Sequence, residues 1–456
     1  MVLCQLRRPF GAPESPHARP ICLSQRTIGE PGYPVQTGSR FIRDSRTLAI
    51  GVFVAQVIAV AISPILTRLF SPTDFGVFSV VVATSTVVGI FSTLRLESII
   101  AVAPTPAVAI RLLHLLMGAA LAMTAMALVA MLAFSSTLGA LLSLPAGAEA
   151  SLLMLPLLIF LFAFYSGVRA WCLRQRRFAT VGTAQVGRAV AAAATGLSLG
   201  FAGLAKIPGL ALLIGQASGD LIFSIMLARP PSRREARLLL APRWSKIQAA
   251  LLQNAQMVRS LVLSQTLIAL YGRLPILVIA SVYGTAEAGF YAFAEMLVAA
   301  PSSLISSAIG DVYRQRAAAY YRACQSFDGI MLRVLALTLT LSVVPFTLAI
   351  LLTPHYFGMI FGLQWQPATF TVTVLLVGAL VAFNSTPVDK AAVIVGAHRY
   401  ILLWHAVRFM IEVLSAVAAV SDLIGYEGYL VAVVTGRGTL HLIDIVIEHR
   451  LAGGKL

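Results

Sequence analysis

Residues 47–67 read TLAIGVFVAQVIAVAISPILT, and this stretch carries no charged side chain. A helix needs about 20 predominantly apolar residues to cross the hydrocarbon core of a bilayer. The stretch therefore predicts a membrane-spanning helix. The same composition pervades the chain, because 58% of its 456 residues are hydrophobic, only 11% are charged, and the mean hydropathy is +0.87. Such a chain cannot cover a soluble surface, so it indicates a polytopic membrane protein.

Apolar runs of similar length repeat along the chain and predict about twelve transmembrane helices. The expected spans are Thr47–Thr67, Phe75–Leu94, Ile110–Phe134, Leu152–Trp171, Thr180–Phe201, Ile207–Ala228, Ser260–Tyr283, Ala286–Ile309, Gly329–Thr353, Pro367–Pro387, Tyr400–Ser421 and Glu427–Ile447. The last span is the most polar, because it contains Arg437, His441 and Asp444. The expected fold class is an all-α polytopic membrane protein.

Two polar segments interrupt this pattern. Residues 1–46 hold seven arginines, six of the 22 prolines and no sustained apolar run, so we expect a disordered basic cytoplasmic arm. Residues 229–259 are rich in arginine, and we expect a basic cytoplasmic linker there; a patch that binds anionic lipid is the alternative. The expected domains are therefore an N-terminal six-helix bundle over 47–228 and a C-terminal six-helix bundle over 260–456.

The positions of lysine and arginine orient the chain in the membrane. With twelve spans, twenty-nine of the 34 basic residues fall on the side of the N-terminus, two fall on the opposite side, and three lie within spans. Because basic residues accumulate in cytoplasmic loops, both termini are expected in the cytoplasm. This distribution also explains the net charge of +16, so it indicates no nucleic-acid partner.

The two halves of the sequence resemble each other. The first expected span ends in Ser63-Pro-Ile-Leu, the seventh contains Leu274-Pro-Ile-Leu, and each is followed by an acid–x–Gly–x–aromatic pattern. The matched residues are Asp74 and Glu287, Gly76 and Gly289, Phe78 and Tyr291, with Arg188 and Arg408 at similar depth in spans five and eleven. This order predicts a duplication. We therefore expect two pseudo-symmetric six-helix bundles around a central cavity.

The turn after the first span resembles a known transporter family. The run from Gln56 through Ser63-Pro-Ile-Leu-Thr-Arg68-Leu-Phe-Ser-Pro-Thr-Asp-Phe-Gly76 is similar to the opening of O-antigen and exopolysaccharide flippases. These are the polysaccharide transporters of the multidrug/oligosaccharidyl-lipid/polysaccharide exporter superfamily. Tyr283-Gly-x3-Ala-Gly-Phe-Tyr-Ala resembles their seventh and eighth helices, and Arg95-Leu-Glu97 resembles the element that closes their second helix, with leucine at the aromatic position. The resemblance runs from Arg46 to the end of the chain.

The resemblance implies a lipopolysaccharide or exopolysaccharide biosynthesis protein of the bacterial inner membrane. Such a protein translocates undecaprenyl-pyrophosphate-linked oligosaccharide repeat units by alternating access, while the lipid tail stays among the membrane lipids. A glycan polymerase and chain-length proteins are the implied partners. The alternative function is a cation-coupled multidrug antiporter of the same superfamily, which would favour buried carboxylates over arginines.

Charged residues within spans are costly and mark either a function or a buried ion pair. Arginine holds the planar oxygens of a pyrophosphate bidentately and stays charged when it is desolvated. The candidate ligands of the pyrophosphate and glycan are Arg273, Arg188, Arg408, Arg68 and Arg95. The candidates for ion coupling or charge pairing are Glu295, Asp220, Glu412 and Glu97.

Some of these charges also have a local structural interpretation. Arg408 and Glu412 stand on one helical face and could neutralise each other, as could Arg437 and Asp444 in the last span. Arg273 is mid-span with no acid near it in the sequence. Its structural alternative is an ion pair between the two bundles, with Glu295 or Asp220.

Arg188 and Arg95 lie close to the cytoplasmic ends of their spans. Their long side chains could therefore snorkel to the membrane surface instead of binding a substrate.

Enzymatic and metal-dependent functions are not indicated. A membrane glycosyltransferase or polymerase needs acidic residues in sizeable polar loops, whereas this chain has no Asp-x-Asp and short outward loops. The 4 cysteines have no Cys-x-x-Cys or Cys-x-x-His spacing, so neither a metal site nor a cofactor is expected.

The expected topology is testable with reporter fusions. Fusions after Leu141 and after His355 should report a periplasmic location, and a fusion after Ser232 should report the cytoplasm, because of the charge asymmetry. A cytoplasmic signal at Leu141 would contradict the twelve-span topology.

Overall fold

The computed structural model describes residues 38–103, 105–203, 206–228 and 244–454, and these residues form helices and turns without a strand. The first half contains α1 (Gly38–Leu69), α2 (Pro72–Thr93), α3 (Leu96–Val102), α4 (Pro106–Leu141), α5 (Glu149–Leu152), α6 (Leu155–Arg174), α7 (Phe178–Phe201) and α8 (Leu210–Leu227). The second half contains α10 (Trp244–Val282), α11 (Thr285–Arg322), α12 (Asp328–Phe361), the 3₁₀ turn η2 (Leu363–Trp365), α13 (Ala368–Ser385), α14 (Ala391–Val395), α15 (His398–Val420) and α16 (Tyr426–Ala452).

Twelve long helices in these described ranges correspond to the twelve expected spans. Ten are long and apolar enough to cross a membrane, and the two parts of α11, Thr285–Val298 and Ser302–Arg322, add an eleventh. These two parts meet at 42°, and the sequence places Pro301, which lacks a backbone N–H donor, between them. The structure therefore confirms an all-α polytopic membrane fold.

The twelfth helix, α7, is too poor in apolar side chains to pass the same test. Its membrane position follows from close packing through small residues against α1 and α8. A Cβ atom on Gly51 of α1 would lie 2.3 Å from the carbonyl oxygen of Gly182 in α7. A Cβ atom on Gly219 of α8 would lie 2.8 Å from the carbonyl oxygen of Arg188. The helix α7 is therefore held by close contacts of its backbone with glycines of α1 and α8 rather than by large side chains.

Two expected segment boundaries are wrong. The helix α1 begins at Gly38, so the last part of the segment expected to be a disordered arm is helical. The helix α10 begins at Trp244, so it extends into the segment expected to be a linker. Residues 1–37 and 229–243, which complete the expected arm and linker, lie outside the described residues.

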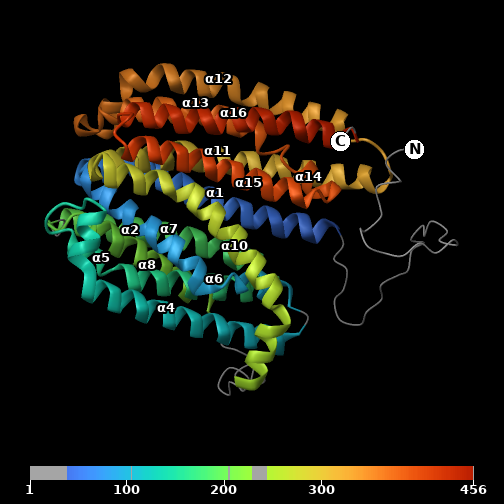
Figure 1. Cartoon of the computed structure of the whole chain (residues 1–456), viewed down its shortest axis with the longest axis horizontal. Coiled ribbons are helices and arrows are strands. Elements are labelled where there is room, and N and C mark those ends of the chain that lie inside the picture. The colour runs from blue at the N-terminus through green and yellow to red at the C-terminus, as the bar shows by residue number, and fades with distance from the viewer. Residues whose placement is uncertain (1–37, 104, 204–205, 229–243, 455–456) are drawn as a thin grey trace.

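The helices run roughly side by side, and α1 begins at the same end of the molecule at which α16 ends (Figure 1). We call this the near end and the opposite one the far end. The turn that joins α1 to α2 lies at the far end, and so does the turn that joins α10 to α11. The start of α1 and the end of α16 therefore lie at one end of the molecule (Figure 1).

The turn after α1 caps the N-terminus of α2. Ser71 is the N-cap of α2, and its hydroxyl accepts a hydrogen bond from the backbone N–H of Asp74. The carboxylate of Asp74 in turn accepts from the backbone N–H of Ser71 at 2.8 Å, which completes a capping box. Its second oxygen accepts from the N–H of Gly209 at the start of α8, at 3.0 Å. Ser71 and Asp74 therefore have structural roles at the start of α2.

The two glycines of the internal repeat meet where α2 and α11 cross at the far end. A Cβ atom on Gly76 would lie 1.7 Å from the carbonyl oxygen of Thr285, the first residue of α11. A Cβ atom on Gly289 would lie 1.9 Å from the carbonyl oxygen of Pro72, the first residue of α2. Each glycine thus faces the start of the other helix. This reciprocal contact joins the two halves in a pseudo-symmetric way.

A buried tryptophan reinforces the far-end contact between the halves. Trp365 of η2 is fully buried and donates from Nε1 to the carbonyl oxygen of Thr67 near the end of α1, at 2.9 Å. Its ring packs edge-on against Phe75 of α2, with centroids 5.0 Å apart, and at a tilt of 53° against Phe293 of α11, with centroids 4.7 Å apart. These aromatic rings close the space between the halves at the far end.

The glycine contact predicts a strong effect of a single methyl group. Gly76→Ala should lower the unfolding midpoint of the purified protein in detergent, because overpacking costs about 1–3 kcal/mol. The matched control is Gly118→Ala in α4, where an added Cβ atom meets no heavy atom within 4 Å. Equal melting of the two variants would contradict a tight crossing at Gly76.

Candidate functional site

A cavity of about 550 Å³ lies between the two halves. Its walls come from α2 in the first half and from α10 and α11 in the second half. The lining side chains include hydroxyls of Ser79 and Thr86, aromatic rings of Phe75, Phe78 and Phe293, and the charged groups of Arg273 and Glu295. This central cavity is therefore apolar and aromatic toward the far end, with one charge of each sign deeper inside.

Arg273 and Glu295 form a loose pair across the central cavity. The distance from Nη1 of Arg273 to Oε2 of Glu295 is 3.7 Å, which is longer than a charge-assisted hydrogen bond of about 2.8 Å. The side chains are 37% and 31% exposed, respectively. Arg273 precedes the end of α10 at Val282 by nine residues, which places it about 14 Å from the far end of the helix. The pair therefore lies near mid-membrane and faces open space.

Arg188 and Arg408, the arginines matched by the repeat, are held in a different way. Nε of Arg188 in α7 lies 2.6 Å from Oδ1 of Asp220 in α8. Nη2 of Arg408 in α15 lies 3.2 Å from Oδ2 of Asp444 in α16. Both aspartates are buried. Each half thus carries the same ion pair between its last two long helices, and we call these the twin pairs.

The structure contradicts both local pairings considered for the last two spans. Glu412 does not neutralise Arg408 on its own helix; it lies 2.6 Å from Nε of Arg437 in α16. Asp444 does not pair with Arg437, because it binds Arg408 and accepts from the hydroxyl of Tyr400. Packing of α15 against α16 brings each charge opposite a partner on the other helix. Spacing along one helix cannot reveal such a crossed arrangement.

The remaining candidate arginines lie at helix ends. Nη1 of Arg95 lies 3.0 Å from Oε1 of Glu97, just after α2 at the near end. Burial raises the pKa of the Glu97 carboxyl, and the charge of Arg95 opposes this shift. Arg68 lies at the far end of α1 and donates from Nη2 to the carbonyl oxygen of Met359 in α12, at 3.4 Å. These side chains and the twin pairs are not among those lining the central cavity.

A second cavity of about 240 Å³ lies within the C-terminal half. It is bounded by α10, α11, α13 and α16, and its lining includes Tyr271, Tyr291, Ser302, Ser306, Arg437 and His441. Glu295 lines this side chamber as well as the central cavity. The carboxylate therefore stands at the boundary between the two spaces.

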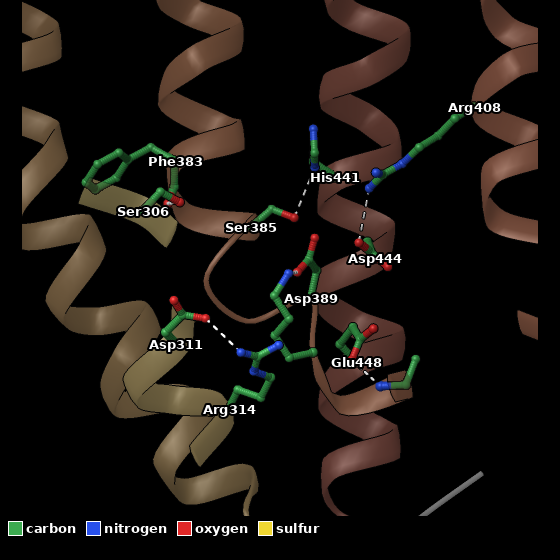
Figure 2. Close-up of polar contacts among 12 residues, drawn as sticks. Ser306, Asp311, Arg314, Phe383, Ser385, Asp389, Arg408, His441, Asp444 and Glu448 are labelled. Atoms are coloured by element: carbon green, nitrogen blue, oxygen red, sulfur yellow. Dashed lines mark hydrogen bonds and ion pairs between the residues drawn. The ribbon is translucent and has the colours of Figure 1, made fainter. Parts of the chain in front are cut away.

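Polar contacts continue from the side chamber toward the near end (Figure 2). His441 lies 3.0 Å from the hydroxyl of Ser385, where α13 ends. Glu448 accepts at 2.8 Å from the backbone N–H of Ala392 in α14. Burial raises the pKa of Asp389, in the turn between these helices, to about 6, although Lys390 beside it acts in the opposite direction. These groups fix the short helix α14 against α16.

Among the described residues, no three or more His, Cys, Asp or Glu side chains form a group that could hold a metal ion.

Sequence reasoning missed two contributors to the site. Arg437 was interpreted only as a local partner of Asp444, yet its guanidinium lies over the ring of Tyr271, 4.7 Å from the centroid, and lines the side chamber. Trp365 carries no charge, and its role depends on a contact with a residue far away in the sequence. The polar character of the last span was the available signal for Arg437.

The twin pairs should act as structural units. Asp220→Asn leaves the positive charge of Arg188 without its carboxylate, so the amount of protein in the membrane should fall, with a loss of about 3 kcal/mol or more in stability. The double change Asp220→Asn and Arg188→Gln should restore much of it, as immunoblots of membrane fractions would show. An unchanged level in the single variant would contradict this role.

Solved structures share the fold at low sequence identity. The lipid II flippase MurJ in an inward closed conformation matches with a TM-score of 0.64 and 10% identity, over 88% of this chain and 86% of that one. The MATE transporter VcmN of Vibrio cholerae matches with a TM-score of 0.52 and 14% identity, over 90% and 96% of the two chains. The MATE multidrug transporter DinF-BH matches with a TM-score of 0.52 and 13% identity, over 90% and 94%. These likenesses show a common fold of two pseudo-symmetric six-helix halves.

The family follows from the sequence itself. No curated protein matches this chain. The family model of polysaccharide biosynthesis proteins matches residues 65–370, which is more than half of the chain. This match confirms the resemblance found in the motifs. The chain therefore belongs to the polysaccharide biosynthesis protein family.

Proposed function

We propose that this protein translocates undecaprenyl-pyrophosphate-linked oligosaccharide repeat units across the bacterial inner membrane. The observation that carries the proposal is the setting of Arg273. It is the arginine that lines the cavity between the halves, and its carboxylate partner is held loosely and half-exposed. Arginine binds phosphate oxygens in a bidentate fork, so Arg273 would hold the pyrophosphate at mid-membrane.

The twin pairs support this assignment by contrast. Arg188 and Arg408 are engaged by buried carboxylates at 2.6 and 3.2 Å, and Arg437 is engaged by Glu412. Removing a partner from such buried pairs is costly, so these arginines are poorly suited to exchange a carboxylate for a substrate. Arg273 is thus our first choice, and Arg188 and Arg408 become structural candidates.

The aromatic walls suit a sugar-bearing substrate. Phe75, Phe78 and Phe293 offer flat apolar faces on which pyranose rings can pack, and the hydroxyls of Ser79 and Thr86 offer hydrogen bonds. The lipid tail would remain in the bilayer beside the protein. Which oligosaccharide enters depends on this lining, and O-antigen or exopolysaccharide units are the proposed class.

The charge asymmetry supports a cytoplasmic position for the near end. On this orientation the Gly76–Gly289 crossing and the Trp365 cluster face the periplasm and close the cavity on that side. Alternating access would then require the two halves to separate at the far end. The proposed rigid units are the bundles over 47–228 and 260–456, with a glycan polymerase and chain-length proteins as partners that receive the product.

A cation-coupled multidrug antiporter is the second candidate, because MATE transporters share the fold. Such an exporter would use a buried carboxylate to bind its cation. Asp220, Glu412 and Asp444 are each bound to an arginine within 3.2 Å. Glu295 is paired with Arg273 as well, although loosely. The tight pairing of the other three carboxylates favours the flippase over the antiporter.

Substitution of Arg273 tests the proposal. Arg273→Ala should insert normally, since it removes a charge from mid-membrane, yet reduce glycan export about tenfold or more. Arg273→Lys should recover only part of the activity, because an ammonium cannot form the planar fork. The measurement is surface glycan in a strain that lacks the native gene, together with the protein level in membranes.

The matched control is Arg259→Ala, which removes an exposed arginine from the same helix outside the cavity. It should leave export unchanged. Wild-type export by Arg273→Ala would remove this residue from the site.

A further inference from the structure

Glu295 occupies an unusual position between two cavities. It lines both the central cavity and the side chamber of the C-terminal half. Within the part of the chain that the structure describes, it is the carboxylate that these two linings have in common, and neither lining contains another. Its environment therefore combines a charged partner on one side with open space on the other.

The pair between Glu295 and Arg273 cancels the charge of the central cavity. These two residues are the charged side chains of its lining, so the cavity as it stands is electrically neutral. A neutral cavity has little attraction for a diphosphate, because electrostatic attraction needs a complementary net charge. The carboxylate must leave Arg273 before two phosphate oxygens can take the guanidinium.

The geometry favours such an exchange at this pair. The nitrogen–oxygen distance of 3.7 Å exceeds the 2.6 Å and 3.2 Å of the twin pairs. The Glu295 side chain is 31% exposed, whereas the Asp220 and Asp444 side chains are 5% and 3% exposed. A loose, partly hydrated pair contributes little to stability, so breaking it costs little.

The side chamber offers Glu295 an alternative position. Its lining includes the guanidinium of Arg437, whose Nε is bound to Glu412, and the hydroxyls of Ser302 and Ser306, which donate to the carbonyl oxygens of Val298 and Phe383. A carboxylate that turns from the central cavity into this chamber would stay near the positive charge of Arg437. The displaced carboxylate would therefore not be left without partners.

We infer that Glu295 is a displaceable stand-in for the phosphate of the substrate. It neutralises Arg273 while the central cavity is empty and turns toward the side chamber when the diphosphate of a lipid-linked substrate arrives. This inference rests on the proposed function. A stand-in of this kind weakens binding and favours release, and it keeps small free anions from occupying Arg273.

Binding of a defined probe tests the inference. The probe is radiolabelled undecaprenyl diphosphate, measured by filter binding to the purified full-length protein in detergent. Glu295→Gln keeps the shape of the side chain and removes its charge, so affinity should rise about tenfold relative to the wild type. Inorganic pyrophosphate should also compete better in this variant. Glycan export should nevertheless be slower, because nothing displaces the substrate from Arg273.

Further variants separate the possible outcomes. Arg273→Ala should bind the probe weakly, and adding Glu295→Gln to it should give no gain, since the stand-in acts through Arg273. The matched control is Asp311→Asn, an exposed acid of the same helix paired with Arg314 at 3.1 Å outside both cavities, which should bind like the wild type.

Two results would overturn the inference. If Glu295→Gln binds no tighter than the wild type while Arg273→Ala binds more weakly, the stand-in role fails and the proposed function survives. If the wild type and Arg273→Ala bind the probe equally, the proposed site fails, and the stand-in fails with it.

Discussion

The contact between Gly76 and Gly289 is the constraint on which the arrangement of the two halves depends. Each glycine lies against the backbone of the first residue of the opposite helix, and no side chain larger than hydrogen fits there. The contact fixes the crossing of α2 and α11 at the far end. The Trp365 cluster and the central cavity follow from this crossing, since both are built from residues on or beside these two helices.

The charged residues divide into two groups with different tasks. The twin pairs and the Arg437–Glu412 pair are tight, and their carboxylates are buried, so they hold neighbouring helices together within a half. The Arg273–Glu295 pair is loose and faces a cavity. In a membrane, where an unpaired charge is costly, the same residue types can serve packing or ligand binding, and the tightness of pairing separates the two roles.

Much of the fold could be predicted from the sequence, because crossing a bilayer imposes a length and an apolar composition that a single stretch reveals. The capping by Ser71 and Asp74 was predictable because the two residues are only three positions apart in the sequence. The duplication also pointed to Gly76 and Gly289, although not to their mutual contact. The helical start of α10 was missed because polar residues extend a helix beyond the membrane without an apolar signal.

The candidate site was less predictable. The position of Arg273 at mid-depth followed from its place in an apolar run, but its partner followed only as a choice between Glu295 and Asp220, because Glu295 reaches it only when α11 folds back beside α10. The crossed pairs of α15 and α16 depend in the same way on the rotation of two helices about their axes. Trp365 and its bond to Thr67 join residues from opposite halves, and no local pattern encodes that proximity.

The length of α10 has a mechanical consequence. Its 39 residues measure about 58 Å, roughly twice the thickness of the hydrocarbon core. This one helix carries Arg273 nine residues before its end at Val282, and Val258, 15 residues earlier, packs in one hydrophobic cluster with Leu96 and Ile100 of the first half. A tilt of a few degrees at Arg273 would be magnified over the roughly 44 Å between this residue and Trp244 into a displacement of a few ångströms at the start of the helix. Binding in the cavity would thus change the position of the start of α10 directly, through the helix itself.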